Sequence, residues 1–116
     1  MPLIEKYLNK GEYYSFHEHK GINSNYFCNA RAFEEIVRYS LKKINDVELV
    51  RTSASHGVEC NITSNKVFIR IHLRIAKNVS LHEKTIEIQR RVSNKIYDIL
   101  EIKVNSIDIK IHEFKK

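Results

Sequence analysis

The sequence predicts an α+β domain: a two-layer βαββαβ sandwich with two helices packed on one face of a single mainly antiparallel or mixed sheet. Three stretches carry this prediction. Residues 66–76 alternate strictly between aliphatic and other side chains, which is the period of a strand. Residues 26–44 and 80–100 instead carry apolar residues in steps of three and four, which is the period of an amphipathic helix.

The alternating stretch, residues 66–76, reads KVFIRIHLRIA. Successive side chains of a strand point to opposite faces of its sheet. One face of this strand is therefore aliphatic and should lie beneath the helices, whereas the other face is largely cationic. The aliphatic face contains Val67, Ile69, Ile71, Leu73 and Ile75, and the opposite face contains Phe68, Arg70, His72 and Arg74.

The two predicted helices are preceded by residues that commonly cap helices. Ser24 or Asn25 can cap the first helix. Ser80 and Glu83 form a capping-box pattern, in which the serine hydroxyl accepts a hydrogen bond from the backbone amide three residues later. The predicted core stripes are Phe27, Ala30, Phe33, Val37, Leu41 and Ile44 in the first helix, and Leu81, Thr85, Ile88, Val92, Ile96 and Ile99 in the second.

Shorter period-two segments supply the other strands. A first strand is expected over residues 12–19 and a last strand over residues 104–114. Residues 58–62 should form a hairpin with the long alternating strand, through a tight turn. Residues 47–53 read as a further strand, either separate from residues 58–62 or continuous with them through a bend at a glycine.

The composition fits one domain, residues 12–116, preceded by a short amphipathic lead-in, residues 1–11. The chain has 116 residues, 42% of them hydrophobic, so it can bury a core without metal or disulfide crosslinks. We expect neither a signal peptide nor a transmembrane helix, because apolar runs are short. Cys28 and Cys60 are expected to be reduced core residues of a cytoplasmic protein. The net charge of +6 permits a polyanionic partner without requiring one.

The hydrophobic pattern of the chain resembles the alkaline shock protein family of low-GC Gram-positive bacteria. The similar segments are INSNYFCNARAFEEIVRYSLKKINDV and VFIRIHLRIAKNVSLHEKTIEIQRRVSNKIYDILEIKVNSIDIKIHEF, the latter with the helix form xxxIQxxVxxxIxxxL and the closing form VNxIDIxI. The resemblance covers residues 12–114. The chain departs from the family at Asp46 and at Glu101, where glycines are common, and it is basic whereas many relatives are acidic.

The resemblance implies a non-enzymatic cytoplasmic protein of the envelope stress response or of cell-envelope homeostasis. Such a protein acts through protein–protein contacts and can self-associate as a homo-oligomer. An integral membrane partner can hold it at the periphery of the membrane. The resemblance brings no catalytic residues, no cofactor and no metal site.

The residues themselves suggest one candidate binding face. The cationic side of the long strand would join residues of the last strand if the two strands are neighbours. This face is either a solvated surface, a docking surface for an acidic protein partner, or an RNA-binding surface, although RNA-binding sheets usually offer several stacking aromatics. Its members are Phe68, Arg70, His72, Arg74, Lys110 and His112.

Three further features of the sequence each allow two interpretations. His17 and His19 share one face of a strand. They are either exposed polar residues or ligands of a metal site that Cys28, Cys60, His72 or His112 would complete. Cys28 lies near a predicted helix start, where the helix dipole can lower a thiol pKa. We expect it to be a packed core residue, with a nucleophile beside a histidine as the alternative that no motif supports. Tyr13 and Tyr14 are expected in the core or at a self-association edge. Phosphate-binding glycine loops and HExxH motifs do not occur, so we expect no enzyme.

Overall fold

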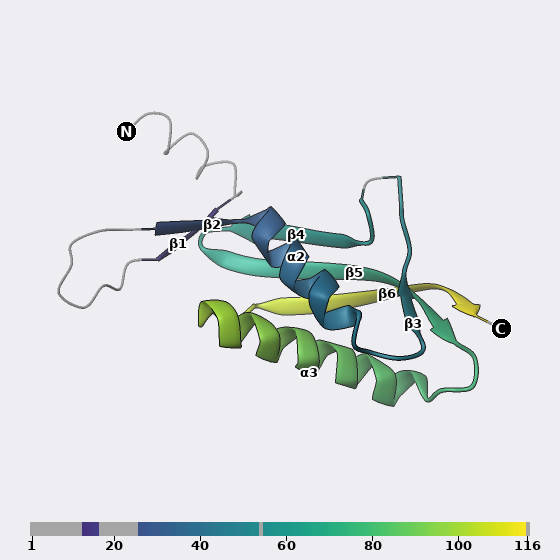
Figure 1. Ribbon diagram of the computed structural model, residues 1–116. Helices are drawn as coiled ribbons and strands as arrows, with labels where there is room; N and C mark the ends of the chain where they lie inside the picture. The colour runs from purple at the N-terminus through teal and green to yellow at the C-terminus, as the bar shows by residue number, and fades with distance from the viewer. Residues whose placement is uncertain (1–12, 17–25, 54, 116) are drawn as a thin grey trace.

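The computed structural model describes residues 13–16, 26–53 and 55–115, and over these residues the chain is an α+β domain (Figure 1). The predicted α+β class is confirmed. The predictions for residues 1–11, His17, His19, Ser24 and Asn25 lie outside the described residues. In chain order the elements are β1 (Tyr13–Phe16), β2 (Tyr26–Asn29), α2 (Ala30–Leu41), β3 (Val47–Leu49), β4 (Val58–Thr63), β5 (Lys66–Ala76), α3 (Leu81–Leu100) and β6 (Ser106–Lys115).

Strand β5 is the centre of a four-stranded mixed sheet (Figure 1). Strands β4 and β3 follow each other along one edge of β5, and both are antiparallel to it. Strand β6 runs parallel to β5 along its other edge. The loop between β3 and β4 returns to the sheet at Gly57, which has a φ of +108° and whose carbonyl accepts from the His72 amide at 2.8 Å. The expected bend at this glycine therefore separates two short strands on one edge.

The aliphatic face of β5 lies in the core, as predicted. All five of its aliphatic side chains are fully buried. They belong to one hydrophobic cluster with buried residues of both helices, because α2 and α3 turn their apolar stripes toward this face of the sheet. The helix residues in this cluster are Phe33, Val37 and Leu41 of α2 and Ile88, Val92 and Ile96 of α3.

The predicted hairpin between β4 and β5 is present. Its turn residues, Ser64 and Asn65, both have positive φ, at 51° and 56°, as a type I′ turn requires. Asn65 has a second role, because its side chain holds the backbone of Ser15 in β1. The Asn65 Oδ1 atom accepts from the Ser15 amide at 2.8 Å, and the Asn65 Nδ2 atom donates to the Ser15 carbonyl at 3.2 Å.

Two predictions about the first third of the chain are wrong. Strand β1 is not part of the main sheet, because it pairs with β2 in a separate two-stranded sheet. The first helix begins at Ala30 rather than residue 26, because the four preceding residues form β2. The helix N-cap is Asn29, whose side chain accepts from the Ala32 amide at 3.0 Å. Tyr14 packs against the core and Tyr13 is half-buried.

The second helix agrees closely with its prediction. Ser80 caps α3, and its hydroxyl accepts from the Glu83 amide at 3.4 Å. The helix ends at Glu101, which adopts a left-handed φ of 59° at the position where the resemblance places a glycine. The predicted core stripe extends too far at both ends, since Leu81 and Ile99 are exposed beyond the buried centre of the helix.

The core packing predicts the effect of truncating a side chain on β5. Replacing the fully buried Ile71 with alanine should lower the free energy of unfolding by about 2–5 kcal/mol, because a cavity is left under the helices. The matched variant Ile99→Ala, at a side chain that is 52% exposed, should cost less than about 1 kcal/mol. Urea denaturation followed by circular dichroism measures both. Equal losses in the two variants would contradict this account of the core.

Candidate functional site on the outer face of the sheet

The face of the sheet away from the helices carries the side chains that the sequence singled out. We call it the outer face. The register sets Arg70 of β5 between Glu59 of β4 and Asp108 of β6, and it sets His72 beside Lys110. The six candidate residues therefore lie on one surface. The outer face consists of Glu48, Glu59, Asn61, Phe68, Arg70, His72, Arg74, Asp108, Lys110, His112 and Glu113.

This face has mixed charge rather than the cationic character expected from β5 alone. Four carboxylates come from the neighbouring strands, and sequence reasoning missed their contribution. Glu48, Glu59 and Asp108 alternate with apolar residues in their own strands, but only the register shows that they lie beside the β5 arginines. Glu113 breaks that alternation and reaches the outer face through the irregularity in the β5–β6 register. These carboxylates are Glu48, Glu59, Asp108 and Glu113.

Arg74 is already paired on both sides. Its Nη1 atom donates to Glu48 at 3.2 Å, and its Nε atom donates to Glu113 at 2.7 Å, with a further bond from Nη2 to the same carboxylate. The hydrogen bond to Glu113, and then its charge and that of Glu48, raise the pKa of Arg74 above its usual value. Arg74 thus stabilises the arrangement of three strands and is less available to a ligand.

His72 is the one nearly buried side chain of this row, at 6% exposure. Its Nε2 atom contacts the Glu59 carboxylate, and its Nδ1 atom lies 2.7 Å from Nε2 of His112. With Nε2 protonated, His72 donates to Glu59 and accepts from His112. Both ring nitrogens are then occupied, so His72 has no lone pair left for a metal ion. Among the described residues, no three His, Cys, Asp or Glu side chains are grouped to bind one.

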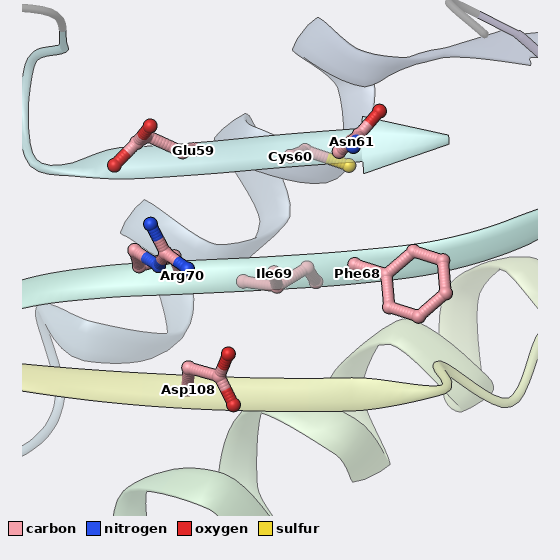
Figure 2. A pocket seen from close by; sticks show the side chains of 7 residues that line it. All are labelled: Glu59, Cys60, Asn61, Phe68, Ile69, Arg70 and Asp108. Atoms are coloured by element: carbon pink, nitrogen blue, oxygen red, sulfur yellow. The ribbon is translucent and has the colours of Figure 1, made fainter. Parts of the chain in front are cut away.

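A shallow hollow opens beside this chain of hydrogen bonds, between β4, β5 and β6 (Figure 2). Its volume is about 360 Å³. Phe68, 38% exposed, and the exposed Arg70 contribute side chains to it. In the described part of the chain no carboxylate forms an ion pair with Arg70, although Glu59 and Asp108 flank it. The lining residues are Glu59, Cys60, Asn61, Phe68, Ile69, Arg70 and Asp108.

The two cysteines do not have the character of nucleophiles. Burial raises the pKa of Cys28, which packs against the core, so the nucleophile alternative gains no support from its position. Burial, and then the negative charges of Glu34 and Cys28, raise the pKa of Cys60 to about 12. Both thiols are therefore protonated near neutral pH, and the thiolate needed for attack is scarce.

Comparisons with protein-family models, curated proteins and solved structures found no match for this chain. The resemblance to the alkaline shock proteins therefore stays a prediction based on hydrophobic pattern and spacing. In the described residues, neither helix has the length and apolar character needed to span a bilayer.

The raised pKa of Cys60 predicts a loss of stability at alkaline pH. Below about pH 9 the thiol is neutral in both folded and unfolded chains, but above it the unfolded chain ionises first and gains free energy. From about pH 8 to about pH 10.5 this group should lower the free energy of unfolding by up to about 2 kcal/mol. Urea denaturation of wild type and Cys60→Ala measures the effect. Over this pH range the free energy of unfolding of Cys60→Ala should fall less than that of the wild type. An equal fall in both proteins would contradict the assignment of the effect to Cys60.

Proposed function

We propose that this protein is a non-catalytic docking module that binds a protein partner through the outer face of its sheet. One observation carries the proposal: Phe68 and Arg70 lie side by side at an exposed hollow, and in the described part of the chain the arginine forms no ion pair. Aromatic residues and arginine are enriched in the parts of protein interfaces that dominate binding energy. The hollow offers both in one place.

The surroundings of the hollow define the partner that fits it. An apolar side chain of the partner would cover the Phe68 ring, and a carboxylate beside it would pair with Arg70. Basic side chains of the partner would meet the flanking carboxylates of Glu59 and Asp108. The partner therefore presents an apolar residue, an acidic residue and basic residues over a short distance.

The outer face is less suited to RNA, which is the alternative function. Four carboxylates on this face oppose a phosphate backbone, and Arg74 is held by two of them. Phe68 is the only phenylalanine, tyrosine or tryptophan that the register assigns to this face among the described residues, whereas sheets that bind bases use several aromatic side chains. The charge pattern therefore favours a protein partner.

The resemblance to the alkaline shock proteins supplies the cellular setting of the proposal. In that setting the module is cytoplasmic and serves the envelope stress response or cell-envelope homeostasis. A membrane-anchored partner would bring it to the periphery of the cell membrane. Self-association would let several modules act on one partner assembly.

Charge reversal on the outer face tests the docking function. Arg70→Glu and Phe68→Ala should each weaken binding to the partner captured by the wild-type protein by about tenfold or more, as expected for central interface residues. Arg31→Glu is the matched control, since Arg31 is exposed on α2, remote from the outer face. Affinity capture from native lysate, followed by titration with the purified partner, measures these changes.

Two results would contradict the proposal. Binding that is unaffected by Arg70→Glu and Phe68→Ala would place the partner elsewhere on the protein. Tight binding to single-stranded RNA that weakens steeply with added salt, and that Arg70→Glu abolishes, would favour the RNA-binding alternative. Fluorescence anisotropy with a labelled oligonucleotide at several salt concentrations measures the second outcome.

A further inference from the structure

The far edge of β6 has no strand partner among the described residues. The backbone of His72 points toward the β3 and β4 edge of β5, because its amide donates to Gly57 and its carbonyl accepts from Val50. Neighbouring residues of a strand alternate in direction, so Ile69 points toward β6. There it is paired in register with Ile107.

This register determines which backbone groups of β6 are free. In a parallel pair, a residue bonds to the two residues that flank its partner, so Ile69 bonds to the residues on either side of Ile107. The amides and carbonyls of Ile107, Ile109 and Ile111 therefore point away from the sheet. The side chain of Gln89 supports this orientation, since it donates to the Ile107 carbonyl at 2.9 Å from α3. The three isoleucine side chains are only half-buried.

Two exposed apolar side chains of α3 lie on the same side as this edge. The flank of α3 that faces α2 is marked by Lys95, whose ammonium lies 5.2 Å from the Tyr39 ring centre of α2. The opposite flank is marked by Gln89 and its bond to β6. Helical spacing puts Ile86 and Tyr97 on the Gln89 flank. These two side chains are 38% and 48% exposed.

We propose that two copies of this chain pair through their β6 edges, antiparallel about a two-fold axis. The pairing joins the two four-stranded sheets into one continuous sheet and puts the two α3 helices next to each other. It pairs the outward amides and carbonyls of β6, among which the Ile107 carbonyl already accepts from Gln89, and it covers the half-buried isoleucines. The two Gln89 flanks, which carry Ile86 and Tyr97, then face each other across the two-fold axis.

The charges of β6 select one register for this pairing. With the two-fold axis at Ile109, Asp108 of each copy lies opposite Lys110 of the other, and opposite charges stabilise such cross-strand pairs. An axis one residue earlier would set Asp108 against itself, and an axis one residue later would set Lys110 against itself. In the Ile109 register, Ile107 also faces Ile111, so the apolar faces match. Because the sequence of β6 is complementary to itself in this register, we infer that a second copy of the chain pairs with the β6 edge.

This inference does not rest on the docking function, because edge pairing extends the sheet and leaves Phe68 and Arg70 exposed, although it engages Asp108 and Lys110 of the outer face. Its test measures the oligomeric state of the purified full chain alone, by sedimentation velocity over a range of concentrations. Wild type should show a reversible monomer–dimer equilibrium. Lys110→Asp should raise the dimer dissociation constant by about tenfold or more, since two attractive pairs become repulsive. The matched control is Lys77→Asp, an equal charge change at an exposed turn, which should leave it unchanged.

The exchange variant Asp108→Lys/Lys110→Asp tests the register itself. It restores opposite charges across the axis, so its dimer dissociation constant should return close to that of wild type. Tyr97→Lys is a second test on the helix surface, where the sheet is not altered, and it should also weaken the dimer by about tenfold. Circular dichroism confirms that each variant is folded.

Three results would overturn the proposal. The first is a wild-type protein that is monomeric at every concentration. This includes the case in which its β6 edge pairs only with a strand of a different protein. The second is a dimer that neither Lys110→Asp nor Tyr97→Lys weakens. The third is a folded exchange variant that stays as weak as Lys110→Asp.

Discussion

The pairing of β5 with three other strands is the constraint on which the rest of the domain depends. Strands β3, β4 and β6 make their main-sheet contacts with β5, and both helices pack on its aliphatic face. Because its side chains alternate strictly, a slip of one residue would turn Arg70, His72 and Arg74 into the core. Burying unpaired arginines is costly, so the alternation excludes every slip by an odd number of residues. The positions of both helices and of both sheet surfaces follow from that register.

The same register determines which side chains and which strand edge are available for binding on the side of the sheet away from the helices. It surrounds the β5 arginines with carboxylates from both neighbouring strands, and it leaves Arg70 and Phe68 as the pair with unused binding capacity. Strand β6, held to β5 along one edge only, leaves its other edge open. The two proposed association surfaces, the outer face for a partner protein and the β6 edge for a second copy, adjoin at Asp108 and Lys110.

The elements with long, regular periods could be predicted from the sequence, and the short ones could not. Strand β5, helix α3 with its Ser80 cap, and the hairpin were recognised because many residues repeat the same pattern. The strand β2 was taken for helix because Phe27 continues the helical spacing by chance, while pairing with β1 determines its conformation. The face of His72 was predictable but its burial was not. Burial depends on Glu59 and His112, which are distant in sequence and meet it only through the sheet register.

Hydrogen exchange of individual amides, followed by NMR, tests the central position of β5 most directly. If β5 is hydrogen-bonded on both edges beneath two helices, the amides of residues 67–75 should be the slowest in the protein and should open only with global unfolding. Those of β1, which pairs with a single short strand, should exchange much faster through local opening. Amides of β5 that exchange as fast as those of β1 would contradict a domain organised around this strand.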